Sequence, residues 1–271
     1  MSDIAIIIPA RYASTRYPAK PLATLKGASG VSRTLLERSV MAGRKAVADF
    51  GGDVALYVAT DDHRIADEAK RIGAEVIMTS ESCRNGTERV SEALKNAGIA
   101  PKIVVNLQGD APLTPPHFVT ALIRTMIDEP ECQMATPVLR CDAEAVQNFI
   151  NDRANGRVGA TTVVSNRVGQ ALYFSKEVIP FTNGKGVVNG EVPVFHHVGL
   201  YAYRPEALAA YMAWEPGPLE TLEGLEQLRF LENGHPIRTV EVSAPGAAFW
   251  ELNNPSDVPL IESYLARMGM E

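Results

Sequence analysis

Three cations stand close together near the beginning of the chain, directly after a run of apolar residues. The apolar run Ile4–Ile8 leads into a segment that contains Arg11, Arg16 and Lys20, punctuated by prolines. Guanidinium and ammonium groups both pair with phosphate oxygens, and proline restricts the conformations of a loop. We interpret the segment as a rigid polyphosphate site, in which these cations would neutralise charge as pyrophosphate leaves. The alternative is a solvated basic turn at the surface.

A carboxylate, Asp110, follows the predicted strand Ile103–Leu107 after Gln108 and Gly109. A carboxylate in this position has water on one side and the sheet on the other, and it is a usual mount for Mg²⁺ that bridges phosphates. The alternative is an aspartate that only starts a turn before Pro112. The basic segment upstream favours the metal site, and we predict Mg²⁺ as the cofactor.

The segment Asn85–Arg89 has the composition of a helix start that could also bind a flat ligand. Gly86 would let the backbone approach such a ligand closely, and Thr87 or the helix N-terminus would offer hydrogen-bond donors. A helix that is merely capped by Thr87 is the structural alternative. Capping and ligand binding can coexist.

A fourth segment, Leu222–Arg229, combines apolar and polar residues at helical spacing. Three leucines should face the core: Leu222, Leu225 and Leu228. Glu223, Glu226 and Gln227 would then share another face of the helix, where they could hold sugar hydroxyls. A solvated helix face is the alternative.

Strands that alternate with helices would position these segments. The predicted strands span residues 4–8, 53–60, 74–79, 103–107 and 134–138, and the predicted helices span 31–48, 63–73, 87–94 and 115–127. This alternation indicates an α/β fold with a mostly parallel central sheet and helices on both faces. Ligands bind at the carboxyl ends of the strands in such sheets, so we expect the chemistry where the first, second and fourth strands end.

After residue 140 the alternation becomes less regular. Further strands are predicted at 161–164, 171–174 and 196–203, helices at 205–214, 221–233 and 255–268, and a mobile glycine-rich loop at 182–193. An α/β core with a smaller β-rich part is the simplest account of this pattern.

The composition is that of an ordinary globular protein. The 271 residues are 46% hydrophobic and 21% charged, with a formal net charge of −6. Nucleic-acid and membrane-surface binders need a basic face, so neither partner is expected. The three cysteines fit no complete disulfide framework. With no signal-like start and no long apolar run, we expect a cytoplasmic protein.

Together these stretches resemble the 3-deoxy-manno-octulosonate (Kdo) cytidylyltransferases, a branch of the nucleotide-diphospho-sugar transferases. The likeness covers nearly the whole chain and is strongest at residues 8–12, 14–16, 18–22, 59–61, 86–89, 108–110, 171–175, 197–201 and 225–229. It implies a Rossmann-like nucleotidyltransferase that couples CTP to the anomeric 2-hydroxyl of an acidic sugar and releases pyrophosphate, for lipopolysaccharide or capsule synthesis. The resemblance also implies a homodimer.

The resemblance assigns roles to individual residues. CTP would be held by Pro9, Ala10, Arg11, Arg16, Lys20, Gly86 and Arg89. The acidic sugar would be surrounded by Gln108, Tyr173, His197, Tyr201, Glu223, Glu226 and Gln227. Arg11, Lys20 and Asp110 would be catalytic, and Asp110 and Asn253 would bind the metal.

The resemblance also implies a single nucleotidyltransferase domain over residues 1–271. Residues 1–140 would bind CTP, residues 141–220 would form the β-rich part that binds the sugar and makes the dimer, and residues 221–271 would add helices that complete the core.

Several positions depart from the family's pattern. The substitutions fall mainly on the metal and acceptor side: Ala111 for Glu, Asn253 for Asp, Cys83 for His, Ala13 and Ala19 for Gly, His196 for Arg, and Thr162 for Lys. An asparagine oxygen can still bind Mg²⁺, but it lacks the charge, and Glu251 or Asp257 would be the nearest compensating carboxylates.

These departures leave three functional interpretations. The first is Mg²⁺-dependent cytidylyl transfer to Kdo or to a close analogue such as amino-Kdo. The second is the same transfer to another acidic acceptor, such as a different 2-keto sugar acid or a phosphonate. The third is a CTP-binding protein with reduced catalysis. A dehydrogenase is excluded because no GxGxxG motif follows the first strand.

Overall fold

Four parallel strands form the centre of the first of two units in the computed structural model, which describes residues 2–14, 16–156, 160–183, 191–244 and 252–271. This unit comprises Met1–Ile123 and Pro245–Glu271. In its described part the strand order is β5 (Glu75–Met78), β4 (Val54–Thr60), β1 (Ile4–Ala10) and β6 (Ile103–Leu107). All three pairings are parallel, which confirms the predicted parallel sheet.

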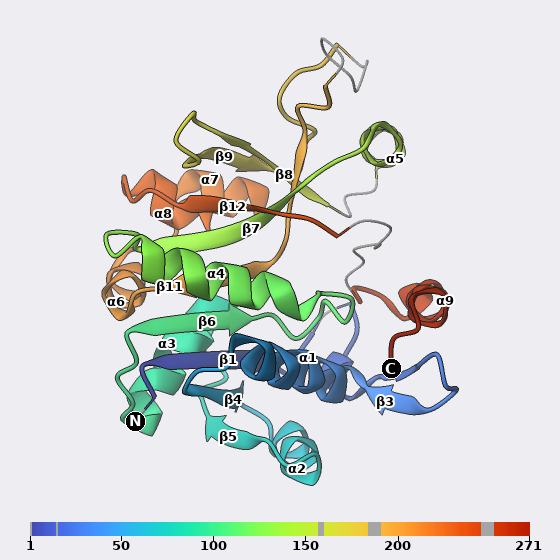
Figure 1. Cartoon of the computed structure of the whole chain (residues 1–271), viewed down its shortest axis with the longest axis vertical. Helices are drawn as coiled ribbons and strands as arrows, with labels where there is room; N and C mark the ends of the chain where they lie inside the picture. The colour runs from blue at the N-terminus through green and yellow to red at the C-terminus, as the bar shows by residue number, and fades with distance from the viewer. Residues whose placement is uncertain (1, 15, 157–159, 184–190, 245–251) are drawn as a thin grey trace. The chain divides into compact units, whose positions relative to one another are not determined.

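Helices cover both faces of these strands. The helices α1 (Leu35–Phe50) and α2 (His63–Arg71) connect β1 to β4 and β4 to β5, whereas α3 (Gly86–Ala97) crosses back to β6. Right-handed crossovers in opposite directions place their helices on opposite faces of a sheet. Figure 1 accordingly shows α1 in front of β1 and α3 behind it.

The first helices begin at capping side chains. Thr34 caps α1 by accepting a hydrogen bond from the backbone of Glu37, and α1 starts later than predicted because Ser32–Thr34 pairs as β3 with β2 (Thr24–Lys26). Asn85 caps α3, so the structural alternative that named Thr87 as the cap is wrong about the capping residue. A short polar side chain outside the first turn satisfies the orphan N–H groups better than one within it.

The second unit, Arg124–Ala244, is built on β-strands. Its strand order within the described residues is β11 (Leu200–Tyr203), β7 (Met134–Arg140), β10 (Phe195–His197), β8 (Thr161–Ser165) and β9 (Ala171–Ser175), with β12 (Arg238–Val242) also paired to β7. The pair β8–β9 is an antiparallel hairpin, as predicted. The single strand predicted at 196–203 is instead split into β10 and β11, which pair with different parts of β7.

One predicted helix of the second unit is wrong. The segment 221–233 forms two short helices, α7 (Pro218–Glu223) and α8 (Leu228–Glu232), because Gly224 adopts φ 60° and ends α7. The break turns Leu222 outward, where it is 82% exposed, while Leu228 is buried.

Four further helices occur in the described structure. They are α4 (Pro116–Asp128), α5 (Ala143–Ala154), α6 (Pro205–Ala213) and α9 (Val258–Met268), with short 3-10 turns at Lys20–Leu22 and Pro255–Asp257. Among the described residues, no helix combines the length and apolar character that crossing a membrane requires.

The boundaries between the two units lie at residues 123/124 and 244/245 of the chain. The sequence suggested boundaries at residues 140 and 220. β7 belongs to the second unit because it pairs with β10, β11 and β12. The roles assigned to the three sequence parts stay predictions. Much of the predicted glycine-rich loop, residues 184–190, lies outside the described residues.

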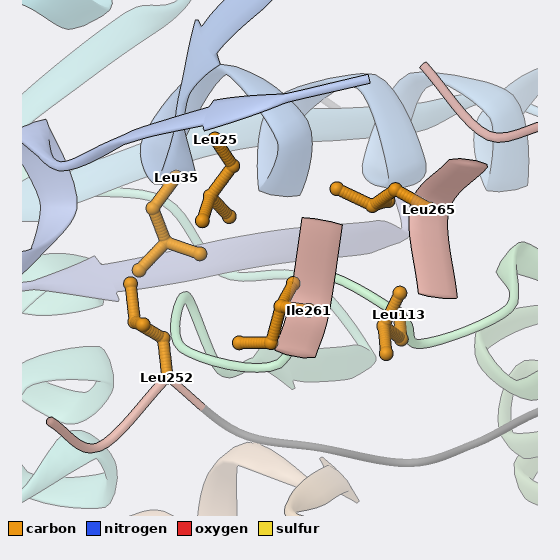
Figure 2. Packing of buried hydrophobic residues seen from close by; sticks show 6 residues of the cluster. All are labelled: Leu25, Leu35, Leu113, Leu252, Ile261 and Leu265. Carbon is orange, nitrogen blue, oxygen red and sulfur yellow. The ribbon is translucent and has the colours of Figure 1, made fainter. Parts of the chain in front are cut away.

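A small apolar cluster holds the carboxyl-end loops of the first unit together. Its buried members, at most 1% exposed, are Leu25, Leu35, Leu113, Leu252, Ile261 and Leu265, and Figure 2 shows their side chains. Tyr17 of the cationic segment packs against the cluster. Leu113 and Leu252 stand close in sequence to Asp110 and to Asn253. Apolar packing on this cluster therefore holds the cationic segment and the segments that contain Asp110 and Asn253 in fixed positions.

Truncation within this cluster should destabilise the protein. Ile261→Ala removes a fully buried side chain, and we expect a loss of about 2–4 kcal/mol in the free energy of unfolding. Leu260→Ala is the matched control because Leu260 is 36% exposed, and it should cost about 1 kcal/mol or less. Urea unfolding measures both, and equal losses would contradict the packing described.

Candidate active site

The cationic segment after β1 reaches the carboxylate after β6. Lys20 Nζ lies 2.9 Å from Asp110 Oδ2, and the two side chains are 16% and 27% exposed. The strands β1 and β6 are adjacent and parallel, so the loops that follow them emerge at the same edge of the sheet. The structure therefore brings together two residues that stand ninety positions apart in the sequence.

A second contact ties the same segment to the C-terminal part of the first unit. Arg16 donates a hydrogen bond to Asn253 Oδ1 at 2.8 Å, and the Leu252 backbone N–H donates to the Asp110 carbonyl at 2.9 Å. These contacts thus bring together four of the predicted phosphate-binding and metal-binding residues: Arg16, Lys20, Asp110 and Asn253.

Backbone hydrogen bonds close the cationic segment into a compact loop. The Ala19 N–H donates to the Tyr12 carbonyl at 3.0 Å, and the Arg64 guanidinium lies 3.4 Å from the centre of the Tyr12 ring. Ala19 has φ 58°, a left-handed conformation that costs an alanine roughly 1 kcal/mol and that explains a family preference for glycine there. The side chain of Arg11 is exposed at the start of this loop.

The polar atoms around Asp110 fit a divalent cation. Asp110 Oδ1 is buried and has no hydrogen-bond partner in the described structure, and Mg²⁺ prefers oxygen ligands of this type. Asn253 follows Leu252, whose backbone N–H donates to the Asp110 carbonyl, and its Oδ1 accepts from Arg16. No group of three or more His, Cys, Asp or Glu residues that could hold a metal occurs among the residues described. A cation would therefore rest on one carboxylate and one amide.

Of the two suggested compensating carboxylates, Asp257 is held by backbone hydrogen bonds. Asp257 Oδ2 accepts hydrogen bonds from the backbone N–H groups of Asn253 and Asn254, at 2.9 Å and 2.6 Å. Asp257 therefore orients Asn253 instead of facing a ligand. Glu251 lies outside the described residues.

The predicted nucleoside segment packs closely against the ends of β1 and β6. A Cβ atom at Gly86 would lie 3.4 Å from Pro9, 3.4 Å from Asn106 and 3.7 Å from Gln108, so the structure brings Pro9, Gly86 and Gln108 together. Ala10, the last residue of β1, is buried. Asn106 is fully buried, and both its polar side-chain atoms have no partner among the described residues. Sequence reasoning missed this buried amide, whose place in an apolar strand carries no functional signal.

The side chain of Arg89 is buried and forms an ion pair inside the protein. Its guanidinium pairs with Asp61 Oδ2 at 3.0 Å and donates to Thr79 Oγ1 at 2.6 Å, and the Arg89 and Asp61 side chains are only 2% and 7% exposed. The pair joins α3 to the ends of β4 and β5. The role of Arg89 toward CTP stays a prediction.

Cys83, which replaces a histidine of the family pattern, is a buried thiol. Its Sγ donates to Glu92 Oε2 at 3.2 Å. Burial, assisted by that hydrogen bond, raises the pKa of the Cys83 thiol to about 12. The thiol is therefore protonated at neutral pH and is no nucleophile.

In the second unit, Glu223 collects donors from β9 and the residue after it. Tyr173 and Ser175 donate hydroxyl groups to Glu223 Oε1 at 3.2 Å and 2.7 Å, and the Lys176 N–H donates to Oε2 at 2.8 Å. Burial, with the charge of Glu223, raises the pKa of Tyr173. Two residues predicted from separate motifs, Tyr173 and Glu223, are thus partners.

Two further sugar-side residues form another pair in the same unit. Tyr201 donates to Gln227 Oε1 at 3.1 Å, and Gln227 Nε2 is buried without a hydrogen-bond partner in the described part of the chain. The rings of His197 and Tyr201 lie 5.6 Å apart. Glu226, next to Gln227, is half-buried.

His197 is a neutral hydrogen-bond donor. Thr136 Oγ1 donates to the Leu200 carbonyl at 2.9 Å, and His197 Nε2 lies 2.9 Å from the same hydroxyl oxygen. The hydroxyl has one proton, so the Nε2 atom of His197 carries its own. Burial, followed by the charge of His196, lowers the pKa of His197 to about 3. Sequence reasoning missed Thr136, whose position in an apolar strand gives no functional signal.

Comparisons with known proteins identify the same family throughout. The family model described as "Cytidylyltransferase" matches residues 5–239. A 3-deoxy-manno-octulosonate cytidylyltransferase of Maricaulis maris is 42% identical over 98% of this chain and 98% of its own. A mitochondrial one of Arabidopsis thaliana is 38% identical over 99% of this chain and 85% of its own.

A solved structure agrees with these relatives. The structure of CMP:2-keto-3-deoxy-manno-octonic acid synthetase complexed with CTP matches with a TM-score of 0.81 and 30% identity, over 98% of this chain and 99% of the other.

The buried pair of Arg89 should matter for stability. Arg89→Met leaves Asp61 buried without its cation, and we expect a loss of about 3 kcal/mol or more in the free energy of unfolding. Arg64→Met is the matched control, because Arg64 pairs with the neighbouring Asp62 while being 59% exposed, and it should cost less than about 1 kcal/mol. Denaturant titration of both variants decides, and a small loss for Arg89→Met would refute a structural role.

Proposed function

We propose that this chain, which belongs to the cytidylyltransferase family and within it to the 3-deoxy-manno-octulosonate enzymes, transfers CMP from CTP to the anomeric 2-hydroxyl of Kdo. Pyrophosphate is the second product. The observation that carries the proposal is the contact of Lys20 with Asp110. It joins a phosphate-binding cation to a metal-binding carboxylate at the carboxyl ends of two adjacent parallel strands, where ligands of such sheets bind.

The residues of the loop provide electrostatic catalysis. Arg11, Arg16 and Lys20 pair with the phosphate oxygens of CTP and neutralise the charge that develops as pyrophosphate leaves. The sugar hydroxyl attacks the α-phosphorus in line, a reaction that depends on position and charge more than on a strong protein base. Gly86 lets the chain lie close to the nucleoside.

Mg²⁺ is the proposed cofactor, held by Asp110 and Asn253. When bound, it would neutralise charge on the phosphates. The buried, unpartnered Asp110 Oδ1 supports this assignment. Because Asn253 contributes no charge, the protein's own cations have a larger share in balancing the triphosphate.

The second unit is proposed to hold the acidic sugar. Gln227 Nε2 offers an unused donor, Tyr201 orients it, and Glu223 can accept from sugar hydroxyls alongside Tyr173. His196 is neutral, because burial, with the nearby charge of Arg153, lowers its pKa to about 4. Position 196 would therefore offer the acceptor carboxylate no positive charge.

The proposal also includes where the enzyme acts, in which synthesis and in which oligomeric state. It places the enzyme in the cytoplasm, in the synthesis of lipopolysaccharide, as a homodimer. The exposed large apolar side chains of the second unit include Leu172, Phe181 and Leu222, and they support an interface there.

Pyrophosphate release tests the function directly. With CTP, Mg²⁺ and Kdo, the purified protein should release pyrophosphate, and Asp110→Asn should lower kcat about a hundredfold or more while CTP affinity measured without metal falls far less. Asp49→Asn is the matched control, because Asp49 pairs with Lys45 on the exposed face of α1, and it should leave kcat unchanged.

Two outcomes would count against the proposal. No release above that of Lys20→Ala excludes cytidylyl transfer to Kdo, and equal losses of kcat and of metal-free CTP affinity in Asp110→Asn make Asp110 structural. A panel of other 2-keto sugar acids and phosphonates, assayed in the same way, shows whether another acceptor is preferred.

A further inference from the structure

We infer that Lys20 acts as a resident counter-ion for Asp110, and that the divalent cation reaches this carboxylate only together with the nucleotide. The inference rests on the proposed function and names the form of its substrate, a preformed metal–nucleotide complex. In the exchange, the ammonium group moves from the carboxylate to a phosphate oxygen as the metal ion takes its place. Each carboxylate and each phosphate then keeps a cation at every stage.

In the contact between Lys20 and Asp110, the ammonium group occupies a carboxylate that a divalent cation could also bind. The ammonium and the carboxylate lie 2.9 Å apart, and both side chains are largely withdrawn from water. A divalent cation at Asp110 would compete with this ammonium for the same carboxylate. The electrostatic energy between two charges at this distance is larger here than in bulk water, because the effective dielectric constant of the surroundings is lower.

The second contact of the loop reinforces the first. Arg16 occupies Asn253 Oδ1, the other oxygen that could bind the metal, and Asn253 brings no negative charge. Lys20 and Arg16 thus occupy one oxygen each of Asp110 and Asn253. A metal ion that arrives alone must therefore displace both cations without offering them another anion, whereas a metal ion bound to a triphosphate arrives with excess negative charge and draws both cations onto its phosphates.

The support of the loop allows the side chains to exchange while the backbone stays fixed. Ala19 is held to the Tyr12 carbonyl, and Tyr17 packs on the apolar cluster. The long side chain of Lys20 can thus swing between two anions from a fixed Cα. Lys45 offers a comparison, because it pairs with Asp49 on the solvent-exposed face of α1, away from the loop.

Binding of Mn²⁺ to the nucleotide-free protein tests the exchange. Free Mn²⁺ is measured by electron paramagnetic resonance, with no CTP present, in wild type, Lys20→Met, Lys20→Arg and Lys45→Met. We expect Lys20→Met to bind Mn²⁺ at least about tenfold more tightly than wild type, because the competing charge is gone. Lys20→Arg keeps the charge and Lys45→Met removes a surface lysine, so both should bind as wild type does. Adding Asp110→Asn to Lys20→Met should abolish the gain.

Unchanged Mn²⁺ affinity in a folded Lys20→Met protein overturns the inference, and so does an equal gain in Lys20→Arg or a gain that survives Asp110→Asn. Thermal melting establishes that each variant is folded, and Lys20→Gln takes the place of Lys20→Met if the latter does not fold. The proposed function has a separate criterion. Wild type that releases pyrophosphate while Lys20→Met gains no Mn²⁺ affinity leaves the function intact and removes the exchange alone.

Discussion

The contact between Lys20 and Asp110 is the interaction on which the functional cluster depends. It exists because β1 and β6 are parallel neighbours, so that the loops after them leave the sheet at the same edge. The apolar cluster beneath then fixes the backbone of the loops that carry Lys20, Asp110 and Asn253. Sheet topology brings the charges together, and packing keeps them there.

The replacement of a carboxylate by Asn253 shifts the electrostatic balance of this cluster. Arg16 donates to the asparagine oxygen, and Asp257 is occupied by backbone N–H groups. Asp110 is therefore the one negative side chain shown to face the loop cations in the described structure. A free metal ion would have to displace the loop cations from Asp110 and Asn253, whereas a triphosphate attracts those cations, which links the unusual residue to the order in which ligands arrive.

The sequence predicted the parts of this picture that depend on local pattern. The buried run Ile4–Ile8 and the alternation of strands and helices indicated the parallel sheet, and therefore the neighbourhood of Lys20 and Asp110. Single residues whose effect depends on tertiary structure were not predictable. Gly224 breaks a helix that leucine spacing had suggested, and Arg89 turns inward to Asp61. Long-range pairing also produced β12, which local propensity did not indicate.

A crystal structure of the protein soaked with CTP and Mg²⁺ tests the central claim most directly. The account predicts that the triphosphate lies against the loop, that Lys20 Nζ has left Asp110 for a phosphate oxygen, and that Asp110 holds the metal ion. A triphosphate bound elsewhere, with the pair of Lys20 and Asp110 unchanged, would contradict it.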